Sequence, residues 1–278
     1  MFNVTGYNDV GLGHVYNTLG IASKILNHNI SFIFDKKSFL GYSIIKKYNY
    51  KCYIQSNKSI IDDIIEINPD VVINDCLGTK EKFILQLKKQ NYKVINFEDK
   101  GKGAKYADLV INAIYEAPKI NKMKNHFYGY KYFILRDEFY QIKPVSINKK
   151  VSNVLITFGG VDPNNYTLKV IESINSYCLL NKINITVIAG IGYNKYETLD
   201  ENIKNITIIK NTKSISDYMS KSDIIFSSAG RTTFETASLG VPTIVLSQNP
   251  RESTHFFSKN SNGFINLGLG YDVNNEII

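Results

Sequence analysis

A histidine directly follows a glycine turn near the start of the chain, in the run Asp9-Val10-Gly11-Leu12-Gly13-His14. Phe2-Asn3-Val4 is typical of the end of a first strand, and Tyr16 to Leu26 carries apolar residues at helical spacing. His14 is therefore expected near a helix N-terminus, where the dipole disfavours the imidazolium form. A neutral imidazole in that place can accept a proton, which is the chemistry of a general base.

Two simpler interpretations of this run stay open. Gly11 and Gly13 also suit a strand-to-helix turn without chemistry, and His14 also suits a structural cap. A dinucleotide-binding fingerprint is less favoured, because its third glycine would fall at Tyr16.

Two later segments, 158–164 and 227–235, also lie where a strand is expected to end and a helix to begin. Backbone N–H groups at such a turn can cradle a phosphate, and small residues let its oxygens approach. We therefore expect nucleotide or substrate binding from the loop residues, which are Gly159, Gly160, Asp162, Ser228, Ala229, Gly230, Arg231, Thr232 and Thr233. Gly159-Gly160 taken alone is equally typical of a plain turn.

Glu235 lies one turn inside the helix that follows the second segment. A carboxylate there can accept hydrogen bonds from the two vicinal hydroxyls of a ribose. The alternative is a favourable charge interaction with the helix N-terminus.

Strand-like and helix-like runs alternate along the chain, which predicts parallel sheets with crossover helices. The expected strands are 2–4, 30–34, 71–74, 93–97, 154–158, 185–189, 206–209, 224–227 and 243–246, and the expected helices include 43–48, 80–90, 107–112 and 166–177. We predict two Rossmann-like α/β halves, 1–145 and 146–278, with a linker from Gln141 to Asn153, which contains Pro144, and a common central cleft.

Composition restricts the classes of function. An apolar fraction of 44% over 278 residues suffices for buried cores, and no stretch resembles a membrane span or a secretory signal, so a cytoplasmic location is expected. The net charge of +8 comes from scattered lysines, which argues against nucleic acid as a partner and agrees with a phosphorylated small molecule. Cys52, Cys76 and Cys178 fit neither a disulfide framework nor a zinc site.

Five segments of the chain form an ordered set of motifs. The segments are Gly11-Leu12-Gly13-His14-Val15, Leu135-Arg136-Asp137-Glu138-Phe139, Phe158 to Asn164, Ser228 to Glu235, and Asn249-Pro250-Arg251-Glu252-Ser253-Thr254. In this order they resemble the nucleotide-sugar hydrolases of pseudaminic acid biosynthesis. The same group includes spore-coat polysaccharide proteins and domains fused to sialic-acid-type cytidylyltransferases, and it is distantly similar to the MurG glycosyltransferase.

The resemblance implies a GT-B architecture in which the C-terminal domain holds UDP and the N-terminal domain supplies the glycine-histidine loop. His14 would activate a water that attacks the anomeric carbon and expels UDP from a UDP-linked diacetamido deoxy sugar with inversion. Asn249 matches a family asparagine near the sugar, and Glu235 matches the position that holds the ribose. No cofactor and no metal are expected.

The chain departs from the family at several points. Asn3 stands where an arginine is common, Thr5-Gly6 where an aspartate is common, and Asp75-Cys76 where some relatives have His-Tyr. Cys76 is expected to pack or line the cleft and is less suited as a nucleophile; His255 either caps a helix or approaches the ligand. Only a short tail follows the family's penultimate unit, so we expect either a shortened chain or part of a larger enzyme, fused to or associated with a CMP-sugar synthetase.

Three functions remain after these arguments. The first is hydrolysis of a UDP-sugar. The second is a glycosyltransferase of the same fold, in which His14 would deprotonate an acceptor hydroxyl. The third is a nucleotide-sugar binding domain without catalysis. The absence of a clear basic amphipathic helix in the sequence favours the hydrolase.

Overall fold

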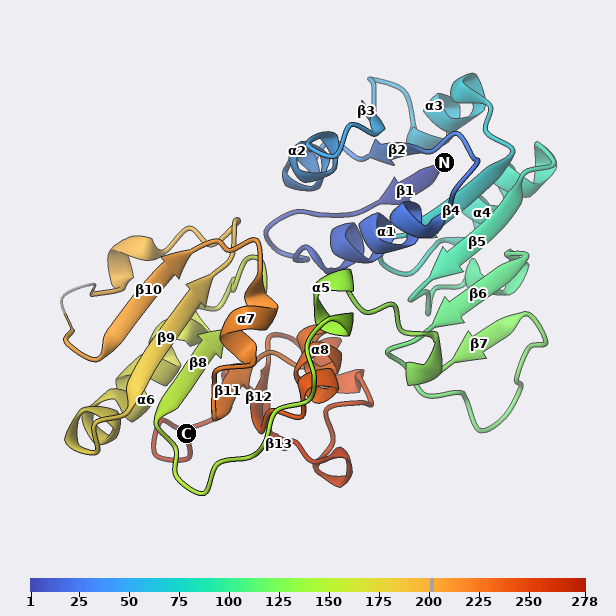
Figure 1. Cartoon of the computed structure of the whole chain (residues 1–278). Helices are drawn as coiled ribbons and strands as arrows, with labels where there is room; N and C mark the ends of the chain where they lie inside the picture. The colour runs from blue at the N-terminus through green and yellow to red at the C-terminus, as the bar shows by residue number, and fades with distance from the viewer. Residues whose placement is uncertain (201–202) are drawn as a thin grey trace. The chain divides into compact units, whose positions relative to one another are not determined.

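The computed structural model describes residues 1–200 and 203–278, which divide into two compact units, Met1–Ile134 and Leu135–Ile278 (Figure 1). Each unit is a parallel sheet with helices on both faces, so the predicted α/β class is confirmed. Within these residues no helix combines the length and the apolar character needed to cross a bilayer.

The N-terminal unit is a doubly wound sheet. Its strands are β1 (Phe2–Val4), β2 (Ser31–Phe34), β3 (Lys51–Ile54), β4 (Val71–Asp75), β5 (Lys93–Phe97), β6 (Leu109–Asn112) and β7 (His126–Tyr128), and its helices are α1 (Gly13–Lys24), α2 (Phe39–Lys46), α3 (Ile60–Ile67) and α4 (Glu81–Lys89). The strand order is β3-β2-β1-β4-β5-β6-β7, and all pairs are parallel. The direction of winding reverses between β1 and β4, which is where sheets of this kind bind ligands.

Both faces of this sheet are apolar because its short strands are rich in branched and aromatic residues. On one face, Ile33, Val72 and Val94 pack with side chains of α3 and α4. On the other, the ring of Phe32 stacks on those of Phe2 and Phe34.

The helix expected at residues 107–112 is wrong. Residues 109–112 form β6, which pairs with β5 and β7. A run of six residues, four of them apolar, is too short for periodicity alone to separate a strand from a helix, and pairing with neighbouring strands decides the outcome.

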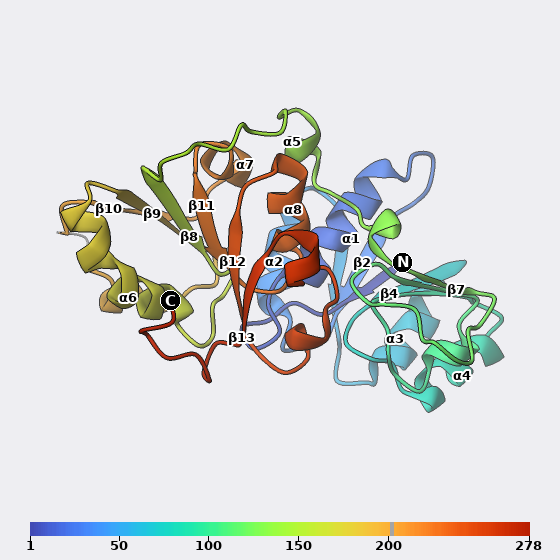
Figure 2. The same cartoon turned by 90° about the horizontal axis from the view of Figure 1, so that it is seen from below.

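The C-terminal unit repeats the same winding. Its strands are β8 (Asn153–Thr157), β9 (Asn184–Ala189), β10 (Ile206–Lys210), β11 (Ile224–Ser227), β12 (Thr243–Ser247) and β13 (Ile265–Leu269), and its helices are α5 (Asp137–Tyr140), α6 (Tyr166–Leu180), α7 (Ile215–Met219) and α8 (Thr232–Leu239). The strand order is β10-β9-β8-β11-β12-β13, with the reversal between β8 and β11. Helix α6 covers one face, and α7 and α8 cover the other (Figure 2).

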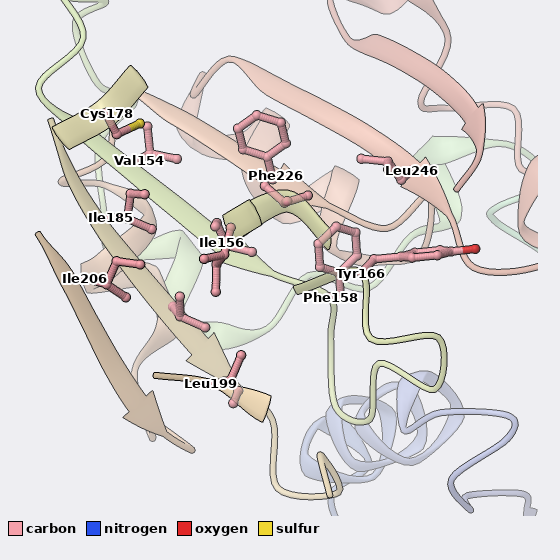
Figure 3. Close-up of a cluster of buried hydrophobic side chains, with 14 of the residues drawn as sticks. Val154, Ile156, Phe158, Tyr166, Cys178, Ile185, Leu199, Ile206, Phe226 and Leu246 are labelled. Carbon is pink, nitrogen blue, oxygen red and sulfur yellow. The ribbon is translucent and has the colours of Figure 1, made fainter. Parts of the chain in front are cut away.

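Two apolar layers enclose this second sheet. The layer beneath α6 contains Ile156, Phe226 and Leu246, with Phe158 and Tyr166 packed edge to face (Figure 3). The opposite layer contains Leu155, Ile225, Met219 and Leu239 together with Phe139 of α5, so the segment from Leu135 onward packs on this unit.

Candidate functional site

His14 is hydrogen-bonded to a buried carboxylate. It is the second residue of α1, and its Nδ1 lies 2.6 Å from Oδ1 of Asp75, the last residue of β4. The side chain of Asp75 is fully buried, whereas that of His14 keeps 14% of its exposure. The second oxygen of Asp75 accepts a hydrogen bond from Asn17 Nδ2 at 2.5 Å. The imidazole is thus held in one orientation while part of its ring remains open.

This contact determines which ring nitrogen can act as a base. A carboxylate only accepts hydrogen bonds, so Nδ1 of His14 carries the hydrogen that points to Asp75. In the neutral ring Nε2 is then the atom that accepts a proton, and a buried carboxylate stabilises the imidazolium that results. The sequence pattern predicts an imidazole near a helix dipole and gives no sign of its carboxylate partner, Asp75.

Strand order explains why Asp75 is the partner. Because β1 pairs with β4, with Val4 opposite Asp75, the turn that follows β1 lies beside the end of β4. Gly11 in that turn has a φ of +88°, which other residues rarely adopt. Helix α1 then begins with Leu12 as its N-cap and no side-chain cap.

A row of buried asparagines fixes the strands next to Asp75. Asn3 Nδ2 donates to Asn74 Oδ1 at 2.9 Å, and Asn74 Nδ2 donates to Asn96 Oδ1 at 2.8 Å. Asn96 in turn donates to Asp99 Oδ2 at 2.6 Å. Each link satisfies buried polar groups only in the observed register of β1, β4 and β5, so a shift of β4 that moved Asp75 would break them.

The loop between β8 and α6 uses its aspartate internally. Gly159 has a φ of +78°, and Asp162, which is 3% exposed, has a φ of +41°. The Asp162 carboxylate accepts the backbone N–H groups of Tyr166 and Thr167, and also Nε2 of Gln248 at 2.8 Å. With both oxygens occupied, Asp162 caps α6 and ties this loop to the end of β12.

The turn between β11 and α8 is made of small residues, as the sequence predicts. Ser228 and Ala229 are buried, and Gly230 and Arg231 are half-buried at the start of α8. The Thr233 hydroxyl donates to the Gly230 carbonyl at 2.8 Å and therefore supports the turn from within the helix.

Glu235 is ion-paired with an arginine 99 residues away in sequence. Arg136 Nε donates to Glu235 Oε1 at 2.8 Å, and Arg136 Nη1 lies 2.9 Å from Glu138 Oε1. Glu138 also accepts the backbone N–H of Ser216 at the start of α7. The Leu135-to-Phe139 motif thus holds Glu235 in place, a role that its sequence did not indicate.

The segment after β12 wraps around the β11–α8 turn. The Glu252 carboxylate accepts the N–H of Gln248 at 2.7 Å and is hydrogen-bonded by the Ser228 hydroxyl and the Ala229 N–H. His255 Nδ1 donates to the Ala229 carbonyl at 2.8 Å. Asn249 is exposed, and its Oδ1 accepts the Glu252 N–H at 3.0 Å.

The predicted site residues therefore fall into two groups. Gly11, Gly13 and His14 lie in the N-terminal unit at the β1–β4 reversal. In the C-terminal unit, the Asp162 loop, the Ser228-to-Glu235 segment and the Asn249 loop are joined through Gln248 and Glu252. Throughout residues 1–200 and 203–278, no three His, Cys, Asp or Glu residues gather as metal ligands.

Comparison with known proteins agrees with this geometry. Residues 154–274 match the glycosyltransferase family 28 C-terminal domain. That domain contains the Asp162 loop, the β11–α8 turn, Glu235 and Glu252. It leaves the His14–Asp75 pair outside the matched residues.

Two relatives are similar to this chain over more than the family 28 domain. The uncharacterized protein MJ1062 of Methanocaldococcus jannaschii is 37% identical over 272 residues, which cover 88% of this chain and 54% of the relative; the chain thus spans about half of that protein. The spore coat polysaccharide biosynthesis protein SpsG of Bacillus subtilis is 24% identical over 98% of this chain and 84% of its own length. The predicted resemblance to spore-coat polysaccharide proteins is therefore confirmed.

The fold matches that of MurG from Acinetobacter baumannii. The TM-score is 0.63 at 13% identity, over 99% of this chain and 87% of the other. The predicted GT-B fold is thereby confirmed, and at this level of identity the match shows the fold alone.

Proposed function

We propose that this chain is a nucleotide-sugar hydrolase that releases UDP from a UDP-linked (di)acetamido deoxy sugar in nonulosonic acid biosynthesis. The observation that carries the proposal is the hydrogen bond of 2.6 Å between His14 Nδ1 and the buried Asp75 carboxylate. A histidine used only as a cap needs no buried carboxylate behind its ring. A base does, because it must hold one tautomer and bear a positive charge during the reaction.

The reaction takes one proton from water. Nε2 of His14 accepts that proton as the water oxygen forms a bond to the anomeric carbon, and the bond between that carbon and the UDP oxygen breaks. UDP leaves with the bonding electrons, and attack from the opposite face inverts the anomeric centre. The imidazolium, stabilised by Asp75, then returns its proton to solvent.

The C-terminal unit is assigned to the nucleotide. N–H groups at the Gly230 turn and the Arg231 guanidinium would stabilise the charge of the diphosphate. Glu235 would accept a ribose hydroxyl with the oxygen that Arg136 does not hold. Asn249 would contact the sugar. The match to the family 28 domain and the similarity to SpsG support this assignment to nucleotide sugars.

A second candidate is a glycosyltransferase, which the match to a glycosyltransferase family favours. In that case His14 Nε2 would take its proton from an acceptor hydroxyl instead of water. The two reactions differ in whether an acceptor is required.

The test is an incubation of the protein with a panel of UDP- and CMP-sugars, in which nucleotide release is measured with and without added acceptors. Hydrolysis predicts free UDP and reducing sugar without any acceptor. His14→Ala and Asp75→Asn should lose this release, whereas the exposed histidine of His28→Ala provides a matched control. Release that depends on an acceptor would make the chain a transferase. UDP binding without turnover of any sugar would leave only the binding domain.

A further inference from the structure

Glu252 places a carboxylate at the turn where a phosphate is expected to bind. The residue is half-buried, but its carboxyl group lies inward against the β11–α8 turn, hydrogen-bonded by the Ala229 N–H and the Ser228 hydroxyl. Its Oε1 would be only 3.2 Å from a Cβ added to Gly230, which is tighter than most real contacts. The glycine at this position therefore leaves room for Glu252 Oε1 at the start of α8.

The segment that carries Glu252 is hydrogen-bonded to both backbone groups of one residue, Ala229. Glu252 takes the N–H of Ala229, and His255 Nδ1 donates to the carbonyl of the same residue at 2.8 Å. The ring of Phe257 stacks on Phe234 of α8, with ring centroids 4.1 Å apart. Because of these contacts, we expect the segment from Glu252 to Phe257 to keep its position when a ligand binds.

Burial, together with one neighbouring negative charge, favours the protonated form of Glu252. Burial raises the pKa of Glu252 to about 7, against the effect of its hydrogen bonds, and the negative charge of Asp162 on the β8–α6 loop raises it further. Other titratable or charged groups near this carboxyl in sequence or space include Tyr166 of α6, His255, which holds the neighbouring carbonyl, Arg231 after the turn and Arg251 beside it in the chain. Near neutral pH, Glu252 can thus exchange a proton with solvent.

We propose that Glu252 is a phosphate contact that takes up one proton from solvent when a nucleoside diphosphate binds at the β11–α8 turn. The proposal rests on the nucleotide binding proposed above and adds a residue to that site. A phosphate oxygen and an ionised carboxylate cannot share the same turn without strong repulsion, and one proton between them removes it. The protonated carboxyl then donates its O–H to the phosphate, while its other oxygen keeps an N–H partner.

Isothermal titration calorimetry with UDP tests this linkage. Binding is measured at pH 8 in two buffers that differ in ionisation enthalpy, which gives the number of protons taken up. Wild type should take up about one proton per UDP, because Glu252 is mostly ionised in the free protein at that pH. Glu252→Gln should take up none, and Glu276→Gln, at an exposed glutamate, should behave as wild type. Titration of UDP's own phosphate is common to all three proteins and cancels in the comparison.

The wild-type protein provides a second readout if Glu252→Gln fails to fold. After correction for the separately measured titration of UDP's own phosphate, its proton uptake should fall as the pH is lowered through 7, because Glu252 is then protonated before UDP arrives. Equal uptake by wild type and a folded Glu252→Gln, or uptake that does not decline with pH, overturns the linkage while UDP binding stands. Proton release on binding also overturns it, because that outcome means displacement of Glu252. If UDP binds to none of the folded proteins, the proposed nucleotide site itself is wrong.

Discussion

The two units have the same winding but different chemistry at the point where it reverses. In the N-terminal unit the last residue of β4 is Asp75, opposite Val4 of β1; in the C-terminal unit the last residue of β11 is Ser227, opposite Thr157 of β8. These two positions are equivalent in the sheets. One places a buried carboxylate behind an imidazole, and the other continues into a turn of small residues, where the Ala229 N–H is hydrogen-bonded to the Glu252 carboxyl.

The helices that follow the first strand of each sheet differ in a related way. Helix α1 has no side-chain cap, and His14 occupies its first turn. The start of α6 is capped by Asp162, which accepts two of its N–H groups. Strand order therefore selects the place where chemistry occurs, whereas one or two residues at strand ends determine which chemistry it is.

Loss of the His14–Asp75 pair in the N-terminal unit should have the greatest effect on activity. His14→Ala should lower turnover at least about 100-fold, the usual contribution of a general base, and leave the affinity for UDP nearly unchanged. Asp75→Asn should cost at least about tenfold but no more than His14→Ala, because Asp75 acts only through the imidazole. Steady-state release of UDP and calorimetry with UDP separate the two quantities. Full activity in His14→Ala would remove the base from this unit.

The strand ends could be predicted from the sequence, whereas partners far apart along the chain could not. Ser228-to-Glu235 follows the apolar run 224–226 closely, and Gly11-to-His14 lies between the apolar run 2–4 and the helical spacing that starts at Tyr16, so local pattern places both at strand-to-helix turns. Asp75 is 61 residues from His14, and Arg136 is 99 residues from Glu235. Those pairs depend on which strands are neighbours and on where α5 packs, which no local periodicity contains.

Substitutions at the Glu235–Arg136 pair test the C-terminal unit. Glu235→Gln should weaken UDP binding by roughly 1.5 to 3 kcal/mol, the range for hydrogen bonds to a charged group, and should do so for substrate and product alike. Arg136→Lys keeps the charge but loses the Nε contact with Glu235, so it should weaken binding in the same direction by a smaller amount. Calorimetry with UDP measures both. An unchanged dissociation constant in Glu235→Gln would leave Glu235 as a helix-terminal charge held by Arg136.

A smaller effect concerns stability and pH. The pKa of Glu252 is about 7 in the folded protein, above its ordinary value of 4.5, so the folded state binds more protons than the unfolded state between these values. This group therefore makes the protein less stable as the pH rises from about 4.5 to 7, by an amount on the order of 1 to 3 kcal/mol. Glu252→Gln should lose that slope. Urea unfolding of both proteins at pH 5 and pH 8 measures it, and parallel pH profiles would show that burial does not perturb this carboxyl.

Chelation should have the smallest effect, and it tests whether nucleotide release requires a metal ion. The carboxylates nearest the β11–α8 turn already have N–H partners: Asp162 accepts from Tyr166, Thr167 and Gln248, and Glu252 accepts from Gln248 and Ala229. Helix N-terminal N–H groups and Arg231 can balance a diphosphate whose charge is spread over several oxygens. Nucleotide release should thus be unchanged in excess EDTA, with added magnesium as the comparison. If EDTA abolishes release and magnesium restores it, the metal-free mechanism is wrong, and Asp162 or Asp75 becomes the first candidate ligand.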